Sequence, residues 1–204
     1  MKIRAFETQI RPLLAFNLND IRKIDPGFHR QQLSYWLDKC YVKPLAGGYY
    51  QLAEQDVNEA YFFMLANRMY APSYISLESA LAYYQVIPES VLGVINVSSR
   101  KTQTFDSPLG RFSYRSLKPT LMFGFRIERV NQQIKFKIAR LEKALLDYLY
   151  LHPAIQSLED FEGLRWNTNR LLEIDHDLFS SYQTIFGSKT LAKRVGLLEA
   201  YLHA

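Results

Sequence analysis

Two stretches near the start of the chain place apolar side chains at the three- and four-residue spacing of an amphipathic helix. The first stripe lies within residues 3–14 and consists of Ile3, Phe6, Ile10 and Leu14. The second helix is expected to begin at Asn17, because Asp20 three residues later completes the pattern of a capping box. Its apolar positions are Leu18, Ile21 and Ile24.

A third helical stretch follows the turn Asp25–Phe28, in which Pro26 fixes φ and Gly27 supplies conformational freedom. Its apolar positions recur at i, i+3, i+4 and i+7 and are expected to face the core: Leu33, Trp36, Leu37 and Cys40. Residues 41–52 then read as two short strands around Ala46-Gly47-Gly48. Three helices followed by a hairpin predict a winged helix-turn-helix domain over residues 1–52.

Residues 53–204 predict a larger α+β domain. A helix over 54–70 is expected to bury Val57, Tyr61, Met64, Leu65 and Met69, and a second helix is expected to start at the cap residue Ser76. The period then changes to the alternation of strands, within residues 91–99, 103–106, 110–117, 120–130 and 134–139. These strands are expected to form an antiparallel sheet. Helical spacing returns over 139–151, and a helical tail follows with expected caps at Asn167, Asp177 and Ser188.

Composition indicates a globular protein of the cytoplasm. Of the 204 residues, 48% are hydrophobic, which is enough for a substantial core. The single cysteine, Cys40, excludes an intrachain disulfide framework and fits a reducing compartment. Charges scattered through residues 1–16 argue against a signal peptide, and no stretch approaches the roughly 18–20 apolar residues of a membrane-spanning helix. We therefore expect a soluble protein without a membrane partner.

Motifs for catalysis are weak or missing. The chain has no phosphate-binding loop and no G-x-S-x-G nucleophile elbow. Ser98 and Lys101 match S-x-x-K, but they lie at a strand end, where the two side chains do not stack as they do on a helix. The four histidines have no ligand-like spacing, and Glu142 and Asp147 are five residues apart, as expected of helix-surface charges. We expect no enzyme activity, no metal and no cofactor.

The third helix of the N-terminal stretch offers side chains suited to reading DNA. In a helix-turn-helix, the first residues of the third helix contact base edges in the major groove. Arginine reads guanine and glutamine reads adenine, whereas contacts from the wing to phosphates set position. The candidate DNA-binding residues are His29, Arg30, Gln31, Gln32, Ser34 and Tyr35 on the helix, with Lys43 and Tyr49 on the hairpin.

Two observations keep an alternative open. Asp38, late on the same helix, would repel phosphate unless it points away or pairs with Lys39 or Arg22. Three helices and a hairpin can also serve as a protein-binding platform. Composition and pattern favour double-stranded DNA as the partner, because residues 1–52 carry 8 basic and 4 acidic side chains.

A second basic block lies within residues 94–143, which hold 11 basic and 3 acidic side chains. On alternating strands, its cations and aromatic side chains should occupy opposite faces. The cations in question are Arg111, Arg115, Lys118, Arg126, Arg129, Lys135 and Lys137. They form either the solvated face of a one-sided sheet or a surface for nucleic acid or an acidic protein, and the former is slightly favoured.

Several segments together resemble the AbiEi-type antitoxins and transcriptional regulators of bacterial abortive-infection toxin–antitoxin loci. They are the hairpin segment "GGYYQL", then "YISLESAL" (Tyr74 to Leu81), "GRFSYRSL" (Gly110 to Leu117) and "IARLEKALLDYLYL" (Ile138 to Leu151). The second and fourth of these are the more specific. The resemblance covers about residues 5–151, and the last fifty residues match only as a helical tail.

The resemblance implies a type IV antitoxin with two roles. Its winged helix would bind inverted repeats in the promoter of its own operon and repress transcription. Its C-terminal domain would counteract a nucleotidyltransferase-like toxin, with no stable complex required. Within "LEKALLD", Glu142 and Lys143 are candidate antitoxic residues, although this helix is better explained as packing on the sheet, with Ala144, Leu145 and Tyr148 inward.

Overall fold

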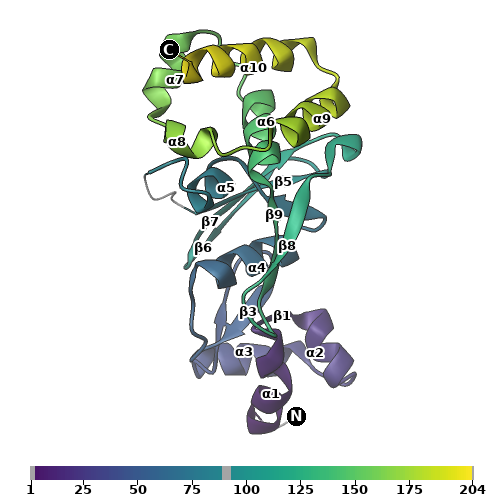
Figure 1. The fold of residues 1–204 in the computed structure, drawn as a ribbon. Helices are drawn as coiled ribbons and strands as arrows, with labels where there is room; N and C mark the ends of the chain where they lie inside the picture. Colours follow the sequence, from purple (N-terminus) through teal and green to yellow (C-terminus); the bar gives the residue numbers. More distant parts are fainter. Residues whose placement is uncertain (1–2, 89–92, 204) are drawn as a thin grey trace.

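The computed structural model describes residues 3–88 and 93–203. In these ranges the chain forms ten α-helices, a three-stranded antiparallel sheet and a six-stranded mixed sheet, so the fold is α+β. Figure 1 shows three layers along the long axis: the small sheet with its helices near the N-terminus, the large sheet, and a group of C-terminal helices at the far end. None of the helices in these ranges is both long and apolar enough to cross a lipid bilayer.

Residues 3–52, which we call the N-terminal module, contain three helices and a hairpin in the predicted order. The first helix is shorter than predicted: it ends at Ile10, and Leu14, with φ of 61°, packs in the core of the larger part of the chain and not with Phe6 and Ile10. The elements are α1 (Ile3–Ile10), the 3-10 helix η1 (Arg11–Leu13), β1 (Ala15–Asn17), α2 (Leu18–Ile24), α3 (Arg30–Asp38), β2 (Val42–Pro44) and β3 (Tyr49–Leu52). The capping box is confirmed: the Asn17 side chain accepts hydrogen bonds from the backbone N–H groups of Asn19 and Asp20, and Asp20 accepts one from the Asn17 N–H. The sequence did not predict β1, which pairs with β3 and gives the sheet order β1-β3-β2.

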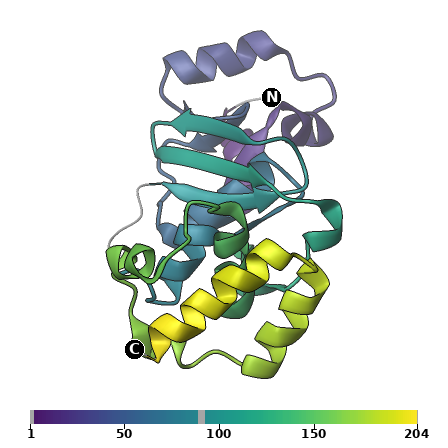
Figure 2. The same cartoon turned by 90° about the horizontal axis from the view of Figure 1, so that it is seen from above.

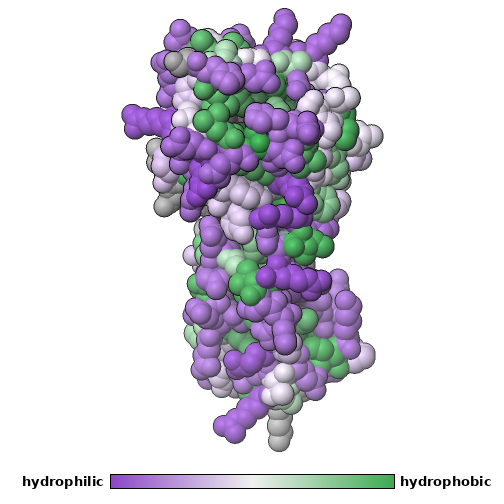
Figure 3. Space-filling view, in the orientation of Figure 1, coloured by the Kyte–Doolittle hydropathy of each residue, from purple (hydrophilic) through white to green (hydrophobic). Residues whose placement is uncertain are grey.

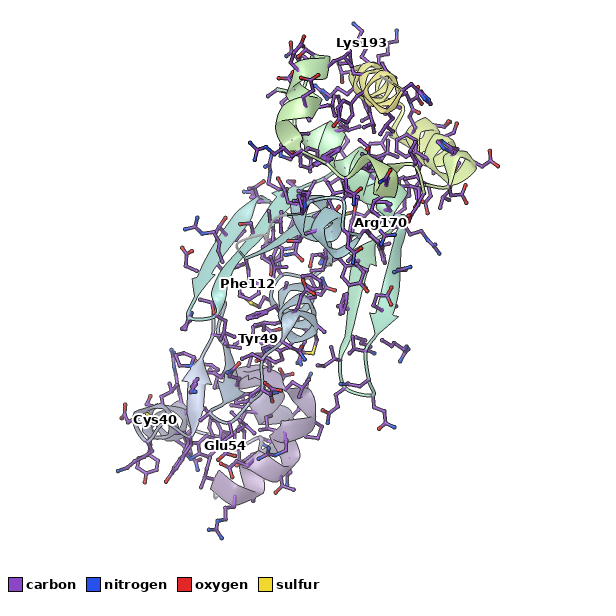
Figure 4. The ribbon with its side chains drawn as sticks, turned by 60° about the vertical axis from the view of Figure 1, so that its left-hand side comes forward. Cys40, Tyr49, Glu54, Phe112, Arg170 and Lys193 are labelled. Atoms are coloured by element: carbon purple, nitrogen blue, oxygen red, sulfur yellow. The ribbon has the colours of Figure 1, made fainter. Side chains whose placement is uncertain are left out.

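The end of α3 corrects the prediction that Cys40 faces the core. The helix ends at Asp38, and Cys40 adopts a left-handed backbone with φ of 56°. The Tyr41 N–H donates to the Trp36 carbonyl and the Cys40 N–H donates to the Leu37 carbonyl, which together form a Schellman-type helix end. Because the chain leaves the helix here, the Cys40 side chain is exposed, and Figure 4 shows it at the outer edge of the module.

The next two helices differ from the prediction at their N-terminal ends. Helix α4 (Glu59–Met69) starts at the N-cap Asn58, so Val57 precedes it and is exposed, whereas the other four expected core residues are buried. A buried strand that the sequence did not predict, β4 (Ser73–Ile75), comes before α5 (Leu77–Tyr83). Ser76 does occupy the N-cap position of α5, but its hydroxyl donates to Asp147 instead of capping the helix.

The large sheet is mixed, which corrects the prediction of an antiparallel sheet. Its strands are β4 together with β5 (Val94–Ser98), β6 (Gln103–Ser107), β7 (Gly110–Ser116), β8 (Phe125–Arg129) and β9 (Lys135–Ala139), in the order β6-β7-β5-β4-β9-β8. The β4–β9 and β5–β7 pairs are parallel, and the other three are antiparallel. Within the strand predicted at 91–99, Val91 and Leu92 lie outside the described residues.

The sheet carries two further departures from the predicted strands. The strand expected over 120–130 is shorter, because the 3-10 helix η2 (Pro119–Leu121) occupies its start. The hairpin formed by β8 and β9 extends from the sheet down to the N-terminal module (Figure 1). The turn of this hairpin therefore lies next to the N-terminal module.

The remaining helices gather at the end opposite the N-terminal module (Figures 1 and 2). They are α6 (Leu141–Leu151), α7 (Leu158–Leu164), α8 (Thr168–Leu171), α9 (His176–Phe186) and α10 (Lys189–Leu202). Ser188 caps α10 as predicted, and Asn167 stands at the N-cap of α8 without a side-chain hydrogen bond. The predicted cap Asp177 is wrong, because the Asp175 side chain accepts the Leu178 N–H and α9 begins at His176.

Buried apolar side chains form two clusters. One lies wholly within residues 6–52 and is built around Phe6, Phe16 and Trp36. The other fills the rest of the molecule but also takes in Leu14, Ala15 and Ala46 of the N-terminal module. The module therefore has a core of its own, and part of its surface is built into the larger core. Over the C-terminal helices, apolar residues also reach the surface seen in Figure 3.

Gly93, which precedes β5, supports a prediction about stability. Its φ is 88°, and a Cβ at this position would lie 2.2 Å from the Arg111 carbonyl oxygen. We expect Gly93→Ala to lower the free energy of unfolding by about 1–3 kcal/mol, measured by urea denaturation. Gly196→Ala is the control, because this helical position has open space around it and alanine should stabilise it by about 0.5–1 kcal/mol. Equal stability of the two variants would contradict the packing at Gly93.

Candidate nucleic-acid interface

Helix α3 presents one polar face to solvent. Arg30 and Ser34 lie one turn apart on this face, beside Gln31 and Tyr35, and all four side chains are exposed. His29, at the N-cap, is exposed as well, and Gln32 is partly covered. The face predicted from the sequence is thus present, and neither the hairpin nor the larger part of the chain covers Arg30 or Gln31.

The rotation of α3 about its axis is fixed by its buried side. Leu33 and Trp36 are each 2% exposed, as predicted, and Leu37 is half-buried. The Trp36 ring packs on Phe6 of α1 and on Phe28 ahead of α3, with ring centroids 4.3 and 5.2 Å apart. Turning the helix would remove the indole from these contacts, so the opposite face is held toward solvent.

The polar side chains of this face have few partners within the protein. Arg30 and Gln31 make no side-chain hydrogen bond or ion pair with any described residue, so their donors remain available. The Lys39 ammonium lies 6.0 Å from the centre of the Tyr35 ring. Asp38 is exposed and forms no salt bridge with Lys39, Arg22 or any other described residue. The negative charge of Asp38 is therefore not neutralised by another residue of the N-terminal module.

The hairpin keeps one of its two candidate residues at the surface. Gly47 and Gly48 have φ values of 64° and 76° and form the turn, as their sequence predicted. Lys43 on β2 is exposed. Tyr49 instead turns toward α4, where its hydroxyl donates to the Arg68 carbonyl at 2.9 Å. Figure 4 shows Tyr49 between the N-terminal module and the larger part of the chain, so this phenol is not directed at an outside partner.

The second basic block does not form one surface. Two strands, β5 and β4, separate the β7 cations from those on β8 and β9. Arg111 pairs with Asp106 at 2.9 Å, and Arg126 pairs with Glu128. Arg115 donates to the Leu151 carbonyl at 3.3 Å, at the end of α6. Three of the seven cations thus have partners within the protein. The other four, Lys118, Arg129, Lys135 and Lys137, form no ion pair with a described residue.

On β9 the predicted alternation holds. Lys135 and Lys137 are exposed, whereas Phe136 and Ile138 are buried against the core. The Lys137 ammonium also lies 5.4 Å from the centre of the Phe125 ring. Together with Arg129, these lysines make the β8–β9 hairpin the most basic part of the large sheet that is not paired with acids.

Sequence reasoning missed a buried ionic cluster, which we call the α6 cluster: Tyr74, Ser76, Lys143 and Asp147. Lys143 and Asp147 were expected at a helix surface or as contact residues, but both are fully buried. The Lys143 ammonium donates to Asp147 Oδ1 and, at 2.9 Å, to the Tyr74 hydroxyl. Tyr74 and Ser76 each donate to Asp147 Oδ2 at 2.8 Å. The cluster joins α6 to β4 and to the start of α5.

Burial shapes the protonation of the α6 cluster. It lowers the pKa of the Lys143 amino group and raises the pKa of the Asp147 carboxyl group, while attraction between the two groups opposes both shifts. The rings of Phe186 and Phe123 lie 4.7 and 5.0 Å from the ammonium. Because no part of the pair reaches solvent, these residues hold the fold together and do not present a contact surface.

Glu142, the other candidate in this motif, also has a structural role. It is 8% exposed, and its carboxylate accepts the Asp175 N–H at 3.1 Å, next to the start of α9. Ala144, Leu145 and Tyr148 are buried, as predicted for a helix that packs on the rest of the domain. The motif residues that carry the family resemblance are thus mostly interior.

Comparison with known proteins adds no relative: no protein-family model matches this chain, and no curated protein sequence matches it either. The resemblance to AbiEi-type antitoxins therefore stays a hypothesis that rests on the segments quoted from the sequence.

Proposed function

We propose that the chain is a sequence-specific DNA-binding repressor of its own operon. The observation that carries the proposal is the solvent-facing row of Arg30, Gln31, Ser34 and Tyr35 on the third helix of the N-terminal module. The order of helices and strands, with the sheet order β1-β3-β2, is that expected of a winged helix-turn-helix. In such a motif this row lies at the floor of the major groove.

Each polar residue then has a separate task. Arg30, in the first turn of α3, can offer a forked donor to guanine O6 and N7, and Gln31 can pair with adenine N6 and N7. His29, Gln32, Ser34 and Tyr35 complete the helix side of the interface. Lys43 on the hairpin meets phosphate and sets position without reading sequence. Double-stranded DNA in the cytoplasm is the proposed partner.

The antitoxin role is the second part of the proposal, and it rests on the family resemblance alone. Under it, the larger part of the chain counteracts a nucleotidyltransferase-like toxin. Because Glu142 and Lys143 are buried, they would act by maintaining the fold of this part, and a toxin-directed surface would lie elsewhere. No enzyme activity, metal or cofactor enters the proposal.

A protein-binding platform remains the alternative use of the N-terminal module. The observation in its favour is the exposure of two aromatic side chains, Tyr35 at 53% and Tyr41 at 38%. Tyrosine is enriched in protein interfaces, where it combines apolar area with a hydroxyl group. DNA binding and protein binding differ in salt dependence, because release of counterions from DNA makes its affinity fall steeply with salt.

The proposal is tested with a reporter placed behind the DNA upstream of the chain's own reading frame. Expression of the full chain should lower reporter output, and a shuffled upstream sequence should abolish the effect. Co-expression with the product of a neighbouring nucleotidyltransferase-like gene tests the antitoxin role by growth rescue. Unchanged reporter output at high protein level would reject the repressor function, and failed rescue would reject the antitoxin role alone.

Lys43 gives a prediction about electrostatics. Lys43→Ala should weaken binding to all duplexes alike and reduce the slope of log K against log salt by about one unit, because one phosphate contact is lost. Fluorescence anisotropy across a salt series measures both quantities. Lys193→Ala is the matched control, because Lys193 lies on α10 at the end of the molecule opposite Cys40 (Figure 4). A slope that does not change in Lys43→Ala would exclude a phosphate contact at the hairpin.

A further inference from the structure

A cavity of about 490 Å³ lies where the N-terminal module meets the β8–β9 hairpin. Its walls come from η1, α4 and the two hairpin strands, so three segments far apart in the sequence form it. Leu13, Met64 and Phe136 supply an apolar floor. The volume lies in the range typical of sites for small molecules, roughly 300–1,000 Å³.

The charge of the cavity has one sign. Arg68, Arg129, Lys135 and Lys137 line it, and no acidic side chain among the described residues does. Neither Arg129 nor Lys135 forms an ion pair with another described residue. Because like charges around one cavity repel each other, an anion bound among them would relieve that repulsion. The cavity is thus complementary to a molecule that carries more than one negative charge.

Asn67 of α4 also lines the cavity. Its Oδ1 accepts the Lys137 backbone N–H, which fixes the orientation of the amide because the N–H requires an acceptor. The other end, Nδ2, is buried and has no hydrogen-bond partner within residues 3–88 and 93–203. The hydrogen bond from Lys137 to Oδ1 ties α4 to β9 and makes the Asn67 amide a fixed part of the cavity wall.

Arg68 connects the cavity to the N-terminal module. Its guanidinium donates to the Leu13 carbonyl at 2.8 Å and lies 3.4 Å from Asp20, the carboxylate of the α2 capping box. The same guanidinium lies 5.9 Å from the centre of the Tyr49 ring. An anion in the cavity would compete with Asp20 for this guanidinium, and the competition acts on α2, the helix before α3.

We propose that this cavity binds a small organic anion, a phosphate monoester with an apolar body, and that Arg68 transmits its presence to the N-terminal module. The phosphate meets the arginines and lysines, which bind it by charge-assisted hydrogen bonds, and the body packs on Leu13, Met64 and Phe136. The size and the concave shape fit a small molecule and not a flat macromolecular partner. The proposal does not depend on whether α3 binds DNA.

Phenyl phosphate is the probe, titrated into the ¹⁵N-labelled full chain and followed by NMR. We expect saturable shifts of the Asn67 side-chain amide and the Lys137 backbone amide. Benzamide, a neutral molecule of similar size, should bind at least about tenfold more weakly, because it lacks the charge. Inorganic phosphate should also bind more weakly, because it lacks the apolar body. No saturable shift, or equal affinity for either comparison molecule, would overturn the proposed ligand class.

A double variant locates the binding site, and NMR shifts in α2 test the role of Arg68. Arg129→Gln combined with Lys135→Gln should weaken phenyl phosphate binding at least about tenfold. Both side chains are exposed, so folding should not change, and Lys193→Gln serves as the control. Unchanged affinity in the double variant would place binding elsewhere and overturn the site. In the unaltered chain, the backbone amide signals of Asn17 and Asp20 should shift during the titration with the same midpoint as the Asn67 signal. If these two signals do not shift, the proposed role of Arg68 is wrong.

Discussion

Asp147→Asn is expected to lower the free energy of unfolding by about 3–5 kcal/mol, because it leaves the buried Lys143 ammonium without its counter-charge. Lys143 and Asp147 are both fully buried, so the ammonium has no contact with bulk water in the folded chain. The Tyr74 and Ser76 hydroxyls, which donate to Asp147 Oδ2, lose a charged acceptor as well. Urea denaturation followed by circular dichroism measures the change.

Two further variants separate the lost charge from other effects. Lys143→Met with Asp147→Leu removes both charges and should recover most of the stability, because apolar side chains of similar volume often replace a buried ion pair without loss. Asp56→Asn, at an exposed loop position, should change stability by less than about 0.5 kcal/mol. If Asp147→Asn were no less stable than this control, the burial of the α6 cluster would be wrong.

Arg30→Ala is expected to weaken binding to the operator by about 1–3 kcal/mol and to relax the choice of base at one position. The guanidinium has no partner within the described residues, so its removal should not affect folding. Selection of bound sequences from a randomised pool, for the unaltered chain and for the variant, measures both effects. A uniform loss across all sequences would instead assign Arg30 to phosphate.

The same variant separates the two proposed roles of the chain. Arg30→Ala should lose repression of the reporter and keep growth rescue, and Arg140→Ala, an exposed arginine outside the N-terminal module, should keep both. The full chain is used because Leu14, Ala15 and Ala46 belong to the larger core, so residues 1–52 alone would expose part of it. Loss of both outputs with a native-like thermal melt would contradict a division of labour between the two parts.

Local sequence patterns were sufficient for most of the N-terminal module. The spacing of Leu33 and Trp36 identified the buried side of α3, and by exclusion its exposed side. Asn17 and Asp20 marked the start of α2 because both halves of a capping box are local in the chain. The β9 strand was equally predictable, since the pleat alternates Lys135 and Lys137 with Phe136 and Ile138.

Features that depend on distant partners could not be predicted in this way. Asp147 was expected at a surface because a buried carboxylate requires partners, and those partners, Tyr74 and Ser76, lie about seventy residues earlier in the chain. The three residues of β4 are all buried and therefore show no alternation. The parallel pairing of β4 with β9 and of β5 with β7 depends on strand order, which the alternation of each strand leaves open.

The basic block shows the same limit. Its seven cations are close in sequence, but strand order sends the β7 arginines to one end of the sheet and the β8–β9 cations to the other. There, Arg129, Lys135 and Lys137 meet Arg68 of α4 and form the cavity beside the N-terminal module. The charge counts were correct, but only the fold determines which charges share a surface.

DNA reading by α3 is tested by binding of the full chain to the duplex upstream of its own reading frame. Anisotropy measures the affinity beside that for a shuffled duplex of equal length and composition. At physiological salt, we expect affinity for the upstream duplex to be at least about 10³-fold above that for the shuffled one. We also expect affinity for both duplexes to fall as salt rises. Equal affinity for the two duplexes, or no binding at low salt, would contradict DNA reading by α3.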